Sequence, residues 1–475
     1  MPQVHLVDIF IVFAFFISII VVTAILSKRV TQKGIEEFSV SSKSLKLFPL
    51  ICSVAASHIG SGLSLGLIGM MYLEGVQVIW IALGHFTGAL LYTLVLGKKI
   101  RKRADASGWG ITKGDLLEEH YGKKGRLLFG GIAAWERIAV TSGQLVAAGV
   151  LLSTMLAQFN INLTTATIIV GALVIINVSF GGLSAVIWAD VIQMFIMVLG
   201  IGILLPIILT AKLEPGTLLA ASEPGFYNLA PTNMVVLGTA AAWFTSALAN
   251  QTVWSRIVSA KNAKTAVQAN VIGSIVGIVW GLIMVYITFT IKAIYPNIQG
   301  NPDAFLLNTI LDGFPIVIIG LIMAALLANI LSTTNTVLLH AVMNITHDLY
   351  SRTFKRNATN EEILRFAKIS TPIIGIAPAI LGIFIPKIIE VQNLGYNFYG
   401  AAITAPFWAS MLFPNKITPT AGFSAMVVGG SVSLFFYFTN LTMIPNAILG
   451  VIASFATLLI VSHFTKGKKA LNSAK

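Results

Sequence analysis

The sequence predicts an all-α protein that crosses a membrane many times. Of its 475 residues, 56% are hydrophobic and 10% are charged, whereas a soluble protein carries about 25% charged residues. Apolar runs of about 20 residues, the length that spans a bilayer as a helix, recur along the whole chain. The net charge of +13 comes from basic residues between these runs, so it indicates membrane topology and not a nucleic-acid-binding surface.

The apolar runs predict about thirteen transmembrane helices in one membrane domain, 1–475. The first run has no basic segment before it and no small-residue cleavage motif, so we interpret it as an uncleaved helix and not as a signal peptide. The runs lie at 7–27, 47–73, 76–97, 127–155, 162–180, 183–211, 234–255, 268–292, 313–345, 368–386, 390–412, 418–438 and 442–463.

The basic residues predict the orientation of these helices. With the N-terminus outside and the C-terminus in the cytoplasm, all but four Lys and Arg residues fall in inner segments. Lys212, Lys292 and Lys387 fall outside, and Arg137 lies within a run. Positive charge concentrates on the cytoplasmic side of membrane proteins. We therefore expect a multi-pass protein of the plasma (inner) membrane.

The second run contains small and polar residues at mid-membrane depth. Such residues let a helix unwind and expose carbonyl groups that can bind a cation, but glycine also lets helices pack closely, and this run does not decide between the two. The residues are Ser57, His58, Gly60, Ser61 and Gly62.

The ninth run carries a cluster of neutral oxygen ligands. Several of them recur at spacings of three and four and so share one helix face. Neutral oxygens suit a monovalent cation such as sodium better than calcium, although any one hydroxyl can instead bond its own helix backbone. The cluster comprises Ser332, Thr333, Thr334, Asn335, Thr336 and His340.

The order of the runs predicts an inverted repeat. Five runs at 47–212 are followed by five at 234–412, and because five is odd the second block enters from the opposite side, as in many secondary transporters. The run at 7–27 precedes the blocks, and two runs at 418–463 follow them. The first run of the second block has a polar patch, including Ser246 and Asn250, but no Gly or Pro within it, so a break there is less certain.

Four segments in order resemble the sodium/solute symporter family, which includes sodium/glucose, sodium/proline and sodium/sialic acid cotransporters. The most specific is GGLSAVIWADVIQ at 181–193. The others are Asn250-Gln251 with Arg256 and Ala260-Lys261, Ser332-Thr333 with Asp348-Leu349-Tyr350, and Ala56 with Ile59-Gly60-Ser61-Gly62.

This resemblance implies a LeuT-like fold and two cation sites. The principal sodium site would use the carbonyls of Ala56, Ile59 and Asn329 and the hydroxyls of Ser332 and Thr333; the family usually has a small residue at the position of Asn329. A second sodium site, or a relay for sodium release, would use Asp190, Asn335 and Thr336.

The solute site is expected among residues that align with the family's pocket and among ionisable groups at the same depth: His58, Gly62, Leu63, His85, Arg137 and Ser246. Few of them could bind a sugar. Arg137 follows Glu136, so it either forms a local charge pair or captures a carboxylate. Adjacent helix residues point about 100° apart, which disfavours both facing one cavity. An Arg on the corresponding helix of the sialic acid members favours an organic anion.

The sequence therefore predicts a sodium-coupled symporter that imports a small organic solute by alternating access, with Na+, the solute and the bilayer as its partners and a monomer sufficient for transport. We expect neither an enzyme nor a nucleic-acid-binding protein. The alternatives are an amino-acid or other polar solute as the substrate, and proton coupling through Asp190 or a histidine. A channel would need a lined pore, and an enzyme a constellation for which only His58, His85 and His340 are candidates.

Overall fold

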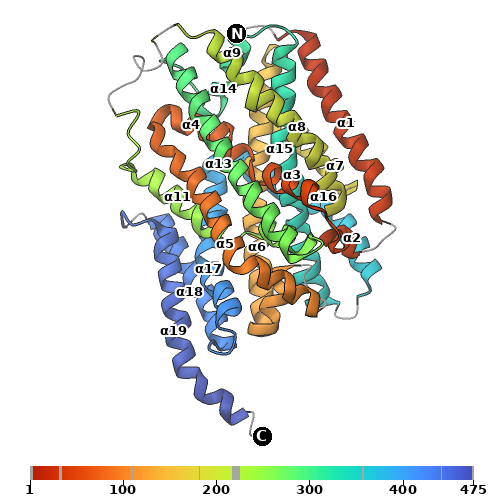
Figure 1. The fold of residues 1–475 in the computed structure, drawn as a ribbon, viewed down its shortest axis with the longest axis vertical. Helices are drawn as coiled ribbons and strands as arrows, with labels where there is room; N and C mark the ends of the chain where they lie inside the picture. Colours follow the sequence, from red (N-terminus) through yellow and green to blue (C-terminus); the bar gives the residue numbers. More distant parts are fainter. Residues whose placement is uncertain are drawn as a thin grey trace.

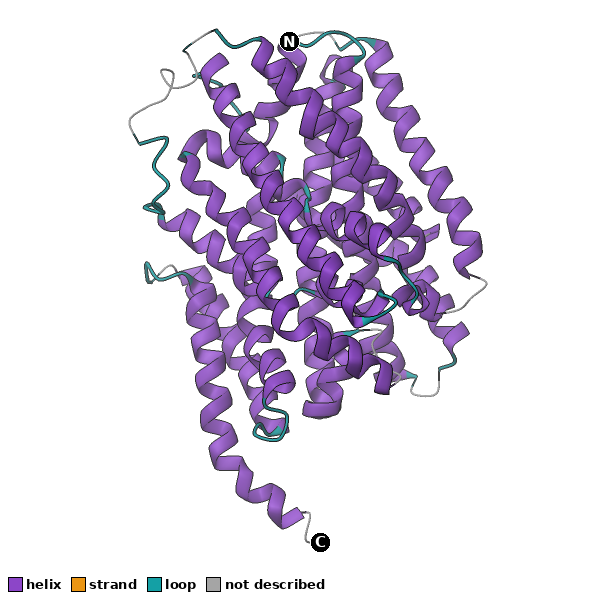
Figure 2. Ribbon diagram, in the orientation of Figure 1, coloured by secondary structure: helices purple, strands orange, loops and turns teal. Residues whose placement is uncertain are grey.

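The computed structural model describes residues 4–31, 35–107, 112–180, 182–214, 216, 225–355, 358–439 and 441–472. Within these ranges the secondary structure is helical, apart from one isolated bridge between Leu45 and Ala260 (Figure 2). Every predicted run coincides with helix. Gly181, in the most specific of the family-like segments, lies outside the described residues.

The helices are numbered in chain order in Figure 1. They are α1 (Leu6–Thr31), α2 (Ile35–Val40), α3 (Leu47–His58), α4 (Leu65–Glu74), α5 (Ile79–Ser107), α6 (Lys113–Met155), α7 (Leu163–Phe180), α8 (Leu183–Met197), α9 (Leu205–Ala211), α11 (Met234–Ala247), α12 (Gln251–Ser259), α13 (Ala263–Ile294), α14 (Phe305–Gly313), α15 (Ile318–Met343), α16 (Asn360–Phe384), α17 (Ile388–Leu412), α18 (Pro419–Thr439) and α19 (Asn446–Asn472).

Among the described residues, nine helices are long and apolar enough to cross a membrane, and the pair α3–α4, bent by 76°, makes a tenth span. The remaining predicted spans are α7, which is shorter, the pair α11–α12, which is interrupted, and α17, which contains Pro406. The count of thirteen therefore stays a prediction.

Two interrupted helices lie at the centre of the bundle. The α3–α4 helix packs on α8, α13 and α15, while α11 packs on α5 and α17. Glycines allow the second contact, because a Cβ at Gly84 or Gly88 of α5 would lie 2.9 and 2.8 Å from backbone oxygens of α11. α1 covers α15 and α8, and α18 and α19 pack against each other and α17 at one side of the bundle (Figure 1).

The interruption between α11 and α12, which the sequence left uncertain, is present. α11 ends at Ala247 and α12 begins at Gln251, with Asn250 as its N-cap; the Asn250 side chain accepts hydrogen bonds from the backbone of Thr252 and Val253. A side-chain cap here takes the place of the glycine or proline that usually marks such a break.

The inner connections differ in part from expectation. The predicted capped start near Asn360 is confirmed, because Thr359 and Glu362 form a capping box at the start of α16. Three basic residues of α6 and α12 that the sequence placed among the inner segments are buried: Lys113 and Arg256 are 0% exposed, and Arg126 is 1% exposed. Their charges lie inside the protein because α6 and α12 turn inward there.

Candidate functional site

The break between α3 and α4 presents two backbone carbonyls to α15. Helix α3 ends at His58, and Ile59 and Gly60 are not helical. The Oγ1 atom of Thr333 lies 3.4 Å from the carbonyl oxygen of Ala56, and the side-chain amide of Asn329 donates to the carbonyl of Ile59 at 2.7 Å. Four of the five residues predicted to bind sodium therefore meet at one place.

The fifth, Ser332, faces another partner. Its hydroxyl donates to Oδ1 of Asp190 at 2.6 Å. The oxygen atoms that could coordinate a cation at the α3–α15 contact belong to neutral, buried groups, which suits a monovalent cation. The side chain of Asn329 occupies the Ile59 carbonyl, and the part of its own backbone carbonyl as a sodium ligand stays a prediction. A sodium ion that binds this carbonyl would lie beside the amide and compete with it for the lone pairs of the oxygen.

Asp190 is fully buried and lies in a network of hydroxyl groups with one guanidinium. Ser53 and Ser57 donate to its Oδ2 at 2.5 and 3.2 Å. Nη2 of Arg256 lies 3.5 Å from the same oxygen and donates to the hydroxyls of Ser57 and Thr336 at 2.8 and 2.9 Å. A cationic side chain thus stands beside Asp190 where a second sodium was expected.

The second predicted cation site is only partly assembled. Asp190, Ser332 and Thr336 share the network, but Asn335 faces α7, where its carbonyl oxygen accepts a hydrogen bond from Asn177 at 2.9 Å. Sequence reasoning missed Arg256 because it was grouped with the inner loop charges. Its place five residues after Gln251, on the short amphipathic helix α12, is the signal that could have located it.

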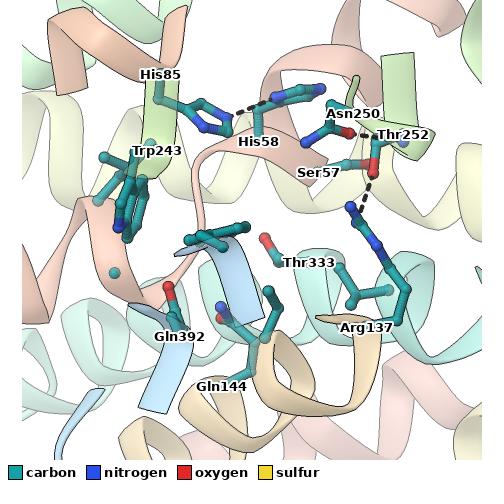
Figure 3. A pocket seen from close by; sticks show the side chains of 16 residues that line it. Ser57, His58, His85, Arg137, Gln144, Trp243, Asn250, Thr252, Thr333 and Gln392 are labelled. Carbon is teal, nitrogen blue, oxygen red and sulfur yellow. Dashed lines mark hydrogen bonds between the residues drawn. The ribbon is translucent and has the colours of Figure 1, made fainter. Parts of the chain in front are cut away.

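A small cavity lies between the two broken helices and α5, α6, α15 and α17 (Figure 3). Its volume of about 20 Å³ holds about one water molecule. Five of the six predicted solute residues line it: His58, Gly62, Leu63, His85 and Arg137. Ser246 is buried but does not line the cavity.

Several further lining residues were not predicted as solute ligands: Ser57, Gln144, Trp243, Asn250, Thr252, Gln392 and Tyr396. Asn250 belongs to a family-like segment, so it had a signal. Gln392 and Tyr396 lie on α17, in a polar stretch with Asn393 and Asn397 to which the sequence analysis assigned no role. Only the fold brings them to the cavity.

Two histidines form one wall of the cavity. Nδ1 of His58 lies 2.9 Å from Nε2 of His85, and the His85 ring packs edge-on against Trp243 at 5.6 Å (Figure 3). The outer nitrogens of the pair, Nε2 of His58 and Nδ1 of His85, have no hydrogen-bond partner among the described residues.

Arg137 is paired with its neighbour. Its guanidinium forms an ion pair with Glu136 through two contacts, one of them 2.7 Å between Nη2 and Oε1. Glu136 is 0% and Arg137 is 2% exposed, and Nη1 of Arg137 also lies 3.4 Å from the hydroxyl of Thr252. The charge pair that the sequence left open is therefore present, and the two charges compensate each other beside the cavity.

The chain is similar to known transporters over almost all of its length. The model of the Sodium:solute symporter family matches residues 38–429. A sodium/proline symporter of Haemophilus influenzae is 25% identical, over 93% of this chain and 94% of its own. The high-affinity proline transporter PutP of Bacillus subtilis is 24% identical, over 91% and 93%.

Among solved structures, the substrate-bound outward-open state of a Na+-coupled sialic acid symporter matches with a TM-score of 0.81 and 16% identity. The match covers 96% of this chain and 97% of that one. At this identity the likeness establishes the fold, and the predicted LeuT-like architecture is confirmed.

Proposed function

We propose, from the premise that the chain belongs to the sodium:solute symporter family, that this sodium-coupled symporter carries a small neutral zwitterion of the amino-acid class. Family membership makes it a multi-pass membrane transporter and not an enzyme, with sodium as the coupling ion. The observation that carries the proposal about the solute is the compensated Arg137–Glu136 pair.

A neutral wall favours a solute without net charge. Arg137 is the ionisable group that the sequence assigned to an organic anion, and its charge is already balanced by Glu136. An anionic solute would therefore be buried without a free cationic side chain from this pair, which is costly. A zwitterion brings its own compensating charge. The named relatives, a sodium/proline symporter and a proline transporter, are consistent with this class.

The cavity offers separate groups for the two ends of such a solute. The free nitrogens of His58 and His85 can hydrogen-bond a carboxylate or an amine. Trp243 and Tyr396, whose rings pack edge to face at 4.8 Å, supply an apolar surface that also suits a cationic amine. The cavity must expand from its present volume to admit any solute, as an alternating-access cycle requires.

Sodium coupling acts through the contact between α3 and α15. A cation that binds the carbonyls of Ala56 and Ile59 together with Thr333 ties the first repeat to the second. It therefore stabilises the conformation in which these helices are close. The predicted orientation, with the N-terminus outside and the C-terminus in the cytoplasm, is part of this proposal.

Uptake into proteoliposomes tests the proposal. A panel of radiolabelled neutral amino acids, simple carboxylates and quaternary amines is offered with an inward sodium gradient, and separately with a proton gradient in the absence of sodium. We expect saturable, sodium-dependent uptake of one or more neutral amino acids. Sodium-driven uptake confined to carboxylates without an amine would refute the solute class, and uptake that follows only the proton gradient would identify proton coupling.

A matched pair of variants tests the role of the compensated charge. Glu136→Gln leaves Arg137 without its carboxylate, so we expect the variant to bind anionic analogues of the solute better than the wild-type protein does. Glu118→Gln, which removes a carboxylate that pairs with Arg126 near the start of α6, serves as the control and should leave the preference unchanged.

A further inference from the structure

The break between α11 and α12 is closed by a lysine from the other repeat. Lys113 is the first residue of α6, follows the N-cap Thr112, and is 0% exposed. Its Nζ atom donates to the backbone carbonyl of Ala249, inside the break, and to the hydroxyl of Tyr399 at 3.1 Å. Among the described residues, no carboxylate lies within ion-pair distance of Lys113.

Aromatic rings surround the ammonium group. Nζ of Lys113 lies 4.6 Å from the centre of the Phe407 ring and 5.7 Å from those of Tyr92 and Tyr399. A cation over the face of an aromatic ring is attracted by the ring quadrupole, and more strongly where water is excluded. The faces of these rings and the dipole of the Ala249 carbonyl thus stabilise the ammonium charge in place of a carboxylate.

The other free carbonyls of this break are bonded by α17. Thr404 donates to the carbonyl of Thr245 at 2.7 Å, and the indole of Trp408 donates to that of Leu248 at 2.8 Å. Tyr399 of α17 donates to the carbonyl of Ala249 at 2.5 Å. Both α11–α12 and α17 belong to the second repeat. Among the described residues, Lys113 is therefore the donor that connects a backbone carbonyl of this break to the first repeat.

The first break has the corresponding arrangement without a built-in cation. In the part of the chain that the structure describes, the carbonyls of Ala56 and Ile59 in α3–α4 meet neutral donors of α15, from Thr333 and Asn329. An inverted repeat places one such break in each half of the protein. One break is thus open to a free cation, and the other already holds an ammonium group.

We propose that Lys113 is a tethered cation that latches the α11–α12 break to α6 and keeps the cytoplasmic side of the transporter closed. This inference rests on the alternating access of the proposed symporter but not on the identity of its solute. When the repeats rock apart on the inner side, the ammonium must leave the Ala249 carbonyl and the rings. Lys113 is a positioning residue, because it does not line the cavity.

Cysteine accessibility tests the latch without any solute. Cys52, the only cysteine, is replaced by serine. Val337, an apolar residue that lines the cavity, is replaced by cysteine. Sealed inside-out and right-side-out vesicles in sodium buffer are then treated with a membrane-impermeant thiol reagent. We expect Lys113→Met to raise the labelling rate from the cytoplasmic side about tenfold and to lower it from the outer side.

Three variants complete the test. Tyr399→Phe keeps the ring but loses one donor to the same carbonyl, so it should raise cytoplasmic labelling less than Lys113→Met does. Lys123→Met removes an exposed lysine of the same helix and should leave labelling unchanged. Lys113→Gln keeps a donor without the charge and, if the Met variant does not fold, replaces it with the same expected direction.

Unchanged cytoplasmic labelling in a folded Lys113→Met or Lys113→Gln protein would overturn the proposal; sodium-dependent thermal stabilisation reports the folded state. Because no solute is added, failure of the proposed solute class does not affect this result. Failure of the latch likewise leaves the uptake experiment unaffected.

Discussion

The contact between Asn329 and Ile59 predicts that a substitution can strengthen sodium binding. The Asn329 amide is 1% exposed and donates to the Ile59 carbonyl at 2.7 Å. In the proposed sodium site the same carbonyl is a ligand, so amide and ion compete for it. Asn329→Ala removes the competitor and keeps both the backbone and the other predicted ligands.

The size of the effect follows from the bond that sodium no longer has to break. A hydrogen bond between neutral groups contributes about 0.5 to 1.5 kcal/mol net. Since 1.4 kcal/mol is a factor of ten in an equilibrium constant, the sodium concentration at half-saturation should fall by about two- to tenfold. The variant should also lose a similar amount of stability when no sodium is present, because the carbonyl is then without a donor.

Sodium-dependent thermal stabilisation of the purified protein, titrated from micromolar to molar sodium with choline as the replacement ion, measures this affinity without a known solute. Asn270→Ala is the matched control, because Asn270 is also 1% exposed and its amide donates to the Ala266 carbonyl of its own helix α13. Its half-saturation should equal that of the wild type. A half-saturation in Asn329→Ala that is unchanged or higher would refute the competition and with it the assignment of the Ile59 carbonyl.

Three further predictions follow from buried contacts. Gly62→Ala should abolish solute uptake while sodium-dependent stabilisation persists, because its Cβ would lie 2.4 Å from Oε1 of Gln392 across the cavity. Burial raises the pKa of the Asp303 carboxyl, in the short turn before α14, to about 6. Ionisation of the buried carboxyl therefore lowers the stability of the folded protein by about 2 to 3 kcal/mol as the pH rises through 6. Asp303→Asn removes this charge and should raise the melting temperature at pH 8 more than at pH 5. Asp190→Asn leaves the Arg256 guanidinium buried without its carboxylate and should lower the free energy of unfolding by about 3 kcal/mol, measured by thermal or denaturant unfolding. Asp190→Asn combined with Arg256→Met should lose less, and equal losses would contradict an ion pair.

Most of the fold could be predicted because its signals are local. Apolar length and the glycine-rich stretch in the second run are written in consecutive residues, and the structure has helices and a sharp bend there. The break between α11 and α12 had no such signal. Its carbonyls are bonded by Tyr399, Thr404 and Trp408, which lie about 150 residues further along the chain. No pattern within the run itself reveals these partners.

The sodium site was predicted from a resemblance to a family, and the structure adds side-chain contacts that a resemblance does not give. The sequence identified Ala56 and Thr333 as neighbours but not the amide that competes for the Ile59 carbonyl. The basic residues show the same limit. Lys113 and Arg256 satisfy a topological rule that counts charges by segment, yet both are fully buried, because where a side chain points depends on how a short helix packs.

The two buried cations bear on how many sodium ions accompany the solute. Arg256 stands beside Asp190, the one acidic group predicted for a second sodium, and Lys113 stands in the break that mirrors the first. Lys113 and Arg256 are part of the chain and cannot cross the membrane with the solute. The occupancy of the positions that they fill therefore does not depend on the sodium concentration or on the sodium gradient. Among the described residues, the donors to the carbonyls at the α3–α15 contact are neutral, and in the proposed sodium site a mobile ion would bind there on one side of the membrane and depart on the other. We therefore infer that coupling to the sodium gradient acts through this contact, while the two side-chain cations set which conformation the protein prefers when no ion is bound.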